Sequence, residues 1–265
     1  ISSGSNKRLY RRYGNFYEAH AMKIIITKNY GELSDKAAEV VLGVVKQNPR
    51  AVLGLATGTT PLGLYAKMIT DHRENGTDYS KVRTVNLDEY KGLPKTHEQS
   101  YAYFMRKNLF DGLGITSEQT NIENGTAKDE KAECLRYDAL LEELPRDIQL
   151  LGLGSNGHIA FNEPGTPFES GTHIVTLAES TMKDNARLFE DIFEVPCKAF
   201  TMGIRQIMQA KKILILASGE NKAEAVYKMV RGAVTEQVPA SVLQLHPDCT
   251  LIADEAAARS ITVGM

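Results

Sequence analysis

Short apolar runs alternate along the chain with longer segments in which apolar positions recur at helical spacing. The first run spans residues 23–27, and apolar positions three and four residues apart follow from Leu33 to Val45. That helix should end before Asn48-Pro49, because the residue before a proline avoids the α region. The same pattern predicts further strands at 51–55, 82–87, 148–153, 212–217 and 250–253, a weaker strand at 199–202, and helices at 60–72, 101–109, 128–144, 204–210 and 222–230. This alternation predicts an α/β fold, a Rossmann-like three-layer sandwich with a mainly parallel central sheet.

Two segments depart from this pattern. Residues 1–21 begin with Ile-Ser-Ser-Gly-Ser and carry arginines among tyrosines without an amphipathic period, whereas Met22 directly precedes the first strand. We therefore interpret residues 1–21 as an added leader and 22–265 as a single domain, with a basic arm that binds RNA or membrane as the alternative. Residues 165 to about 181 are polar and irregular, and we expect a lid over roughly 165–195.

The composition argues against several functional classes. A formal net charge of −2 gives no overall basic field for nucleic acid or anionic lipid. No apolar run approaches the ~20 residues that span a bilayer, and no secretory signal is evident. The cysteines Cys134, Cys197 and Cys249 lie far apart without CxxC spacing, which disfavours a disulfide scaffold or a zinc site. We expect a cytoplasmic protein with free thiols and no metal.

Two loops at the expected carboxyl edge of the sheet have features of phosphate sites. The loop Thr57-Gly58-Thr59-Thr60 leads into a helix, with Thr60 expected as its N-cap and Pro61 as its first residue. Exposed backbone N–H groups at a helix start favour anions, although an ordinary strand-to-helix turn has the same sequence character. Lys222 follows Gly219 in a similar position, where a lysine is commonly just a solvated helix residue. Two such loops on one edge favour phosphate binding.

A candidate proton acceptor follows the strand expected at 82–87. Asp88 stands where that strand ends, so its carboxylate could take a proton from a carbon next to a carbonyl group. The alternative is an aspartate that caps the next helix. Glu89 competes for the same catalytic role, and spacing alone does not decide which carboxylate faces the ligand.

The segment after the strand at 148–153 contains the clearest candidate chemistry. It reads Gly154-Ser155-Asn156-Gly157-His158 and continues to Glu163. Glycines let the backbone approach a ligand closely. A histidine can transfer protons near neutral pH, and Glu163 could orient it or keep it protonated. A lone histidine is more often structural, but a histidine in a glycine-rich loop with a nearby glutamate favours a functional role.

Three motifs together resemble the glucosamine-6-phosphate deaminase family. They occur in that family's order and approximate spacing, and the similarity runs from about Met22 to Ala258. The string His-Ile-Ala-Phe-Asn-Glu-Pro is the most specific part. The motifs are Leu55-Ala56-Thr57-Gly58-Thr59-Thr60-Pro61, Asn86-Leu87-Asp88-Glu89-Tyr90 and Gly157-His158-Ile159-Ala160-Phe161-Asn162-Glu163-Pro164-Gly165.

The resemblance implies a role for each residue. Asp88 matches the family's base, which moves a proton between C2 and C1 of the opened sugar. His158 matches the residue that opens the pyranose ring, with Glu163 as its partner. Asn156 stands where many members carry an aspartate, so here His158 would be oriented by hydrogen bonding and Glu163 would be the only acid of that group. Arg187 and Lys222 match the phosphate ligands, together with the Thr57–Thr60 loop. The family uses neither a metal nor an organic cofactor.

The resemblance thus implies deamination and isomerisation of glucosamine 6-phosphate to fructose 6-phosphate and ammonia, in amino-sugar catabolism. Two alternatives remain: a 6-phosphogluconolactonase-like hydrolase, which shares the architecture, and a non-catalytic domain that senses sugar phosphates. Regulated members of the family bind an effector between subunits through basic residues, and the stretch Gly171–Val175 offers no Arg or Lys there. We therefore expect a monomer or small homo-oligomer whose partner is a small sugar phosphate, with no nucleic acid or membrane partner.

Overall fold

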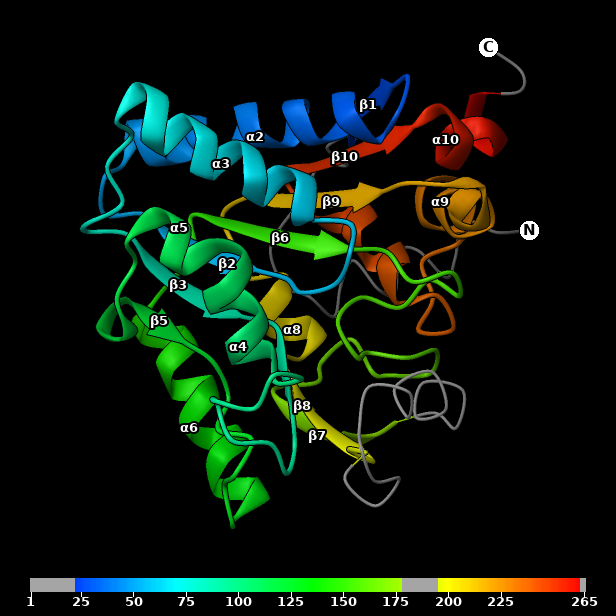
Figure 1. The fold of residues 1–265 in the computed structure, drawn as a ribbon. Coiled ribbons are helices and arrows are strands. Elements are labelled where there is room, and N and C mark those ends of the chain that lie inside the picture. Colours follow the sequence, from blue (N-terminus) through cyan, green and yellow to red (C-terminus); the bar gives the residue numbers. More distant parts are fainter. Residues whose placement is uncertain (1–21, 178–194, 263–265) are drawn as a thin grey trace.

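The computed structural model describes residues 22–177 and 195–262, and within them the chain forms a parallel central sheet (Figure 1). Every pairing in this sheet is parallel, so all carboxyl ends meet at one edge. In the described residues it has seven strands, in the order β1 (Lys23–Thr27), β10 (Cys249–Asp254), β9 (Ile213–Ala217), β6 (Ile148–Gly152), β2 (Val52–Leu55), β3 (Arg83–Asn86) and β5 (Thr120–Asn121). The predicted fold class, a three-layer α/β sandwich with a mainly parallel sheet, is confirmed.

Helices flank the sheet, and α2 and α3 run side by side along it (Figure 1). Asn29 caps α2 by accepting a hydrogen bond from the N–H of Glu32, and Asp129 caps α6 in the same way. The helical elements are α2 (Tyr30–Gln47), α3 (Leu62–Asn75), α4 (Tyr101–Met105), the π-helix η1 (Arg106–Phe110), α5 (Asp111–Leu113), η2 (Ser117–Gln119), α6 (Glu130–Glu143), α8 (Ile204–Ile207), η4 (Glu220–Lys222), α9 (Ala223–Arg231), η5 (Pro239–Leu245) and α10 (Glu255–Thr262).

The start of α3 differs from the prediction. Pro61, not Thr60, is the N-cap, and its own side chain makes no capping hydrogen bond. The hydroxyl of Tyr30 takes over this function, because it lies 3.0 Å from the carbonyl oxygen of Thr60 and accepts a hydrogen bond from the N–H of Gly63 at 2.8 Å. A long-range contact from α2 thus replaces the local cap that the sequence suggested.

A second, antiparallel sheet carries the segment that directly follows β3. It consists of β4 (Asp88–Tyr90), β8 (Lys198–Thr201) and β7 (His173–Thr176), in that order. The prediction that residues 165–181 are irregular throughout is therefore wrong at 173–176. These residues form a strand because they pair with β8, a distant segment that the local sequence does not reveal. Of the predicted lid, residues 178–194 lie outside the described part of the chain, as does the predicted leader.

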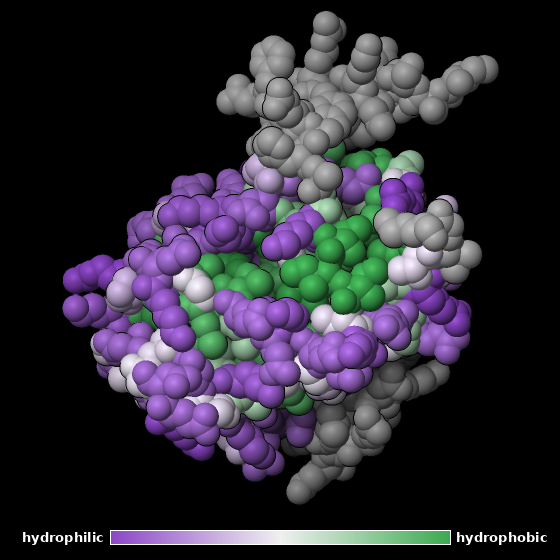
Figure 2. Space-filling view, turned by 90° about the horizontal axis from the view of Figure 1, so that it is seen from above, coloured by the Kyte–Doolittle hydropathy of each residue, from purple (hydrophilic) through white to green (hydrophobic). Residues whose placement is uncertain are grey.

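Central strands of the sheet are almost completely buried, as their apolar sequences predicted. β2 and β9 are buried along their whole lengths, whereas β1 lies at the sheet edge with Ile26 42% exposed. Viewed from above, apolar residues gather in the middle of the face within a border of polar ones (Figure 2). In residues 22–177 and 195–262 no helix has the length and apolar character to cross a membrane.

Candidate active site

A cleft of about 280 Å³ lies at the carboxyl ends of β2, β3 and β6. Ligands of open α/β sheets bind at this edge. Loops that follow several strands form its walls, as expected for the carboxyl ends of parallel strands. The lining residues are Ala56, Thr57, Gly58, Thr60, Leu87, Asp88, Tyr101, Gly152, Leu153, Gly154, Ser155, His158, Ala160, Phe161 and Lys222.

Two tyrosines from neighbouring helices hold the loop after β2. The hydroxyl of Tyr30 lies 3.1 Å from the carbonyl oxygen of Thr59, and the buried Tyr65 donates to the carbonyl oxygen of Ala56. Gly58 has a φ of +95°, which a residue with a side chain rarely adopts. These constraints direct the loop's backbone toward the cleft just before α3, where the helix dipole favours an anion.

Lys222, at the end of the short helix η4, also lines the cleft. Burial lowers the pKa of its ammonium group, and the described residues offer it no ion-pair partner. The preceding loop is fixed by Asp254 at the end of β10, which accepts hydrogen bonds from the Ser218 hydroxyl and from the N–H of Gly219. A half-buried lysine without a counter-ion is well suited to receive an anionic ligand.

The structure separates the functions of the two neighbouring carboxyl groups. Glu89 accepts hydrogen bonds from the backbone N–H groups of Tyr90, Tyr101 and Ala102, at 2.8, 2.9 and 2.9 Å. Its side chain therefore stabilises the first turn of α4. Asp88 lines the cleft and accepts no such bonds from the described residues, so the capping alternative considered for Asp88 applies to Glu89 instead. Asp88 is the carboxyl group that remains available to a ligand.

Burial makes Asp88 a weak acid. Asp88 is only 7% exposed, and its pKa is raised to about 8. Desolvation is the larger cause, and the nearby charge of Glu89 is the smaller one. Desolvation also raises the pKa of Glu89, to about 7. A third carboxyl group, Glu123, is fully buried just after β5, and desolvation, followed by the charge of Asp88, raises its pKa well above the usual range. The sequence analysis did not identify Glu123, because its proximity to Asp88 arises only from the pairing of β3 with β5.

His158 is held by a network that involves Asn156 and Glu163. The Nδ1 atom of His158 lies 3.2 Å from Glu163 Oε1, although the approach is not collinear with the ring N–H direction. Asn156 donates to Glu163 Oε2 at 2.7 Å and accepts from the backbone N–H of His158 at 3.1 Å. The contact with His158 is the main cause that lowers the pKa of Glu163. The described hydrogen bonds of Asn156 thus reach His158 through its backbone and through Glu163, and not through the imidazole ring.

Backbone geometry places the imidazole ring against the sheet edge. A Cβ atom on Gly154 would collide with the ring of His158, so only glycine lets the ring lie there. Ala160 has a φ of +51°, a strained value for a residue with a side chain. Within the same segment, Asn162 is fully buried and donates to the carbonyl oxygens of Ile159 and Met202, both at 2.9 Å. Asn162 therefore has a structural role in fixing the loop.

An aromatic wall of the cleft was not foreseen from the sequence. Tyr101 and Phe161 line the cleft and stack almost in parallel, with ring centroids 6.2 Å apart and an interplanar angle of 4°. Tyr90 packs against Tyr101 at 4.6 Å. The motif that contains Phe161 was recognised, but nothing in the sequence indicated that Tyr101, the first residue of α4, would stack against it.

Most of the sequence-predicted site residues therefore come together. Six of them line one cleft: Thr57, Gly58, Thr60, Asp88, His158 and Lys222. Asn156 and Glu163 do not line it, but Glu163 contacts His158 and Asn156 donates a hydrogen bond to Glu163. Thr59 does not line this cleft, and Arg187 lies outside the described residues. In the described ranges, 22–177 and 195–262, no cluster of three or more His, Cys, Asp or Glu side chains has the geometry of a metal site.

A family model described as glucosamine-6-phosphate isomerases/6-phosphogluconolactonase matches residues 28–252. The chain belongs to this family. The resemblance that the three sequence motifs indicated is thereby confirmed.

Similar proteins divide into close and distant relatives. A "Glucosamine-6-phosphate deaminase" of Lachnoclostridium phytofermentans is 54% identical over 232 residues, which cover 87% of this chain and 98% of the relative. One of Clostridium perfringens is 51% identical over 239 residues, which cover 90% of this chain and 99% of the relative. A solved structure of a monomeric glucosamine-6-phosphate deaminase, 48% identical, matches with a TM-score of 0.86 over 90% of this chain and all of the other. A 6-phosphogluconolactonase from Trypanosoma cruzi, 18% identical with a TM-score of 0.74, covers 94% of this chain and all of its own and shares the fold alone.

Proposed function

We propose that this protein is a deaminase of glucosamine 6-phosphate, which it converts with water into fructose 6-phosphate and ammonia. The observation that carries the proposal is one cleft in which Asp88, a buried carboxyl group with a raised pKa, and His158 lie with two anion-binding loops. Relatives about 50% identical carry the deaminase name, which also supports it. The monomeric solved relative supports a monomer or small oligomer acting on a small sugar phosphate.

In this proposal the phosphate binds between the two anion loops. Thr57, Gly58 and Thr60 supply backbone N–H groups and hydroxyls, and Lys222 supplies a positive charge. The resemblance adds Arg187. Binding of the phosphate orients C1 and C2 of the sugar near Asp88 and His158, so binding energy from a group that does not react lowers the barrier of the chemical steps.

Ring opening is assigned to His158. The imidazole takes the proton from the O1 hydroxyl and returns a proton to O5 as the C1–O5 bond breaks, which gives the open-chain aldehyde. Glu163 beside Nδ1 favours the protonated imidazole that forms between these two transfers. Asn156 fixes the carboxylate of Glu163 by hydrogen bonding.

Isomerisation is assigned to Asp88. Its carboxylate removes the proton from C2 while a proton from the substrate's ammonium group passes to O1, which gives an enolamine. The carboxylic acid of Asp88 then protonates C1, which leaves a C=N bond at C2. Water adds to C2, and ammonia leaves to give the ketone of fructose 6-phosphate. A base whose conjugate acid has a pKa of about 8 is suited to both proton transfers near neutral pH.

The direct test is product formation by the purified protein. With glucosamine 6-phosphate, we expect equal amounts of ammonia and fructose 6-phosphate, measured by two coupled assays, and no loss of activity with a metal chelator. Hydrolysis of 6-phosphogluconolactone without release of ammonia would instead assign the chain to the lactonase branch. Sugar phosphate binding without turnover would assign it to the sensing alternative.

The raised pKa of Asp88 predicts an unusual acid limb of the pH profile. The proposed base is active as the carboxylate, which is lost as the pH falls through the folded-state pKa. We therefore expect kcat/KM to decline below an apparent pKa of about 8, in place of the usual carboxyl range near 4. Since the charges of Asp88 and Glu89 interact, the midpoint belongs to the pair. Glu89→Gln removes the neighbouring charge and should move the midpoint to lower pH, whereas a wild-type midpoint at or below pH 5 would contradict the assignment.

A further inference from the structure

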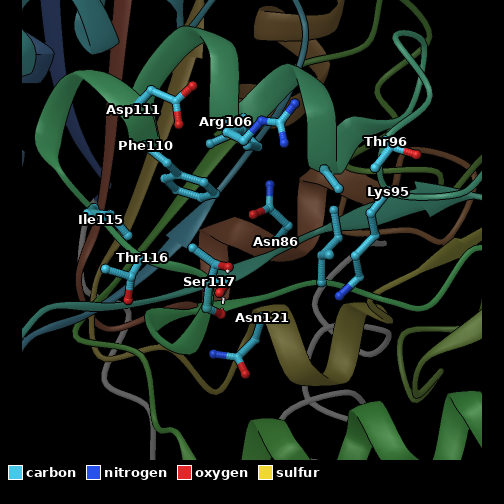
Figure 3. Close-up of a pocket in the computed structure, with 14 residues that line it drawn as sticks. Asn86, Lys95, Thr96, Arg106, Phe110, Asp111, Ile115, Thr116, Ser117 and Asn121 are labelled. Atoms are coloured by element: carbon cyan, nitrogen blue, oxygen red, sulfur yellow. Dashed lines mark hydrogen bonds between the residues drawn. The ribbon is translucent and has the colours of Figure 1, made fainter.

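A second cavity, of about 440 Å³, lies beneath α4 and η1 and shares no lining residue with the proposed active site. Figure 3 shows it with Lys95 and Thr96 at one end, Phe110 and Ile115 at the other, and Arg106 between them above Asn86. Its volume is within the usual range of small-molecule sites. We propose that this cavity is a second binding site, and that its ligand is a small organic monophosphate with an apolar body.

The floor of the cavity contains a polar group without a partner. Asn86, the last residue of β3, is 2% exposed, and its side-chain nitrogen makes no hydrogen bond in the described residues. In Figure 3 this amide lies in the middle of the cavity and its nitrogen points toward the helix above. A buried N–H group without an acceptor costs about 1–3 kcal/mol, and a ligand oxygen would remove that cost.

Two cations line the cavity, Lys95 at one end and Arg106 over its middle, and the charge of Lys95 also acts on Glu89. Lys95 and Arg106 line it, and neither forms an ion pair within the described part of the chain. The guanidinium of Arg106 lies 5.2 Å from the ring centroid of Tyr103, which leaves its hydrogen-bond donors available. The carboxylate of Asp111 lies at the same end as Phe110, so an anionic group is favoured away from that end, toward Lys95 and Arg106. A phosphate dianion would match both charges, whereas a carboxylate would match only one.

Apolar side chains determine the rest of the ligand. Met105, Phe110, Ile115 and Ile122 are all less than 10% exposed and form the apolar part of the lining. A fully hydrated polyol would bury hydroxyl groups against these side chains without partners, which disfavours binding. The site therefore suits a phosphate on a ring or chain that is at least partly apolar, in contrast to the amino sugar of the proposed active site.

The π-helix η1 carries both a cation and an apolar side chain of the cavity, Arg106 and Phe110. η1 spans Arg106–Phe110, and such short π segments within α-helices often mark functional sites. The two cavities lie back to back, because Asn86 and Ala102 line the second one while their neighbours Leu87 and Tyr101 line the first. A ligand in the second cavity would touch the helix that Glu89 caps, on the side away from Asp88.

Phenyl phosphate is a suitable probe, since it combines a dianion at pH 8 with an apolar ring. Amide NMR shifts of the wild-type protein should show saturable changes at Phe110 and Ile115. Arg106→Ala and Lys95→Ala should each raise the Kd of these changes about tenfold or more. Lys107→Ala, on the same helix but outside the lining, should leave the Kd unchanged, and so should Lys222→Ala, which removes a cation of the proposed active site.

Three results would overturn the proposal. Shift changes confined to Gly58 and Lys222 would place phenyl phosphate in the active site alone. Equal affinity for benzyl alcohol would show that the ring binds without the phosphate, and equal affinity for benzoate would exclude the preference for a dianion. The wild-type shift map does not depend on any variant, so a variant that fails to fold leaves the test intact. The binding test is also independent of the deaminase assay, so either proposal can fail alone.

Discussion

Replacing Asp88 by asparagine should lower kcat for glucosamine 6-phosphate by ~10²-fold or more, the usual contribution of a general base. The amide keeps the shape of the side chain but cannot accept the proton from C2. Burial already disfavours the charge of Asp88, so a neutral amide should not weaken the fold. Steady-state kinetics and the melting temperature of the variant test both statements, and KM should change little because the phosphate loops are untouched.

Glu89→Gln is the matched control for this variant, since it makes the same chemical change at the next residue. Glutamine has one acceptor oxygen where the carboxylate now accepts from three backbone N–H groups. We expect a loss of stability of about 1–3 kcal/mol for the unsatisfied groups and a smaller loss of kcat. A crippled but stable Glu89→Gln together with a nearly normal Asp88→Asn would reverse the two roles.

The sequence was informative where one local rule determines the structure. Apolar runs identified the strands of the central sheet except the two-residue β5, because strands buried on both faces need continuous apolar residues. The sequence was less informative where a contact with a distant segment determines the local structure. The start of α3 depends on Tyr30 from α2, and β7 depends on its pairing with β8. Helix α10, too, was not predicted, although its apolar positions pack into the core.

The candidate site shows the same division. Residues within a recognisable motif, such as His158 and Glu163, could be grouped from the sequence because a tight loop holds them together. The choice between Asp88 and Glu89 could not be made, because it depends on where α4 starts and which carboxyl group its N–H groups bind. Glu123 could not be found for a related reason, since the sheet, and not the sequence, places it near Asp88.

The phosphate site makes the second large prediction. Lys222→Ala should raise KM for glucosamine 6-phosphate by roughly 10- to 150-fold, which corresponds to ~1.5–3 kcal/mol for one charged hydrogen bond. The half-buried ammonium group has no ion-pair partner in the described residues, so its loss removes a contact to the ligand and none to the protein. Lys228→Ala on α9 is the control, because Lys228 pairs with the exposed Glu224 and should leave KM unchanged. Unphosphorylated glucosamine should be turned over equally poorly by the parent and by Lys222→Ala. An unchanged KM in Lys222→Ala would mean that the phosphate binds elsewhere.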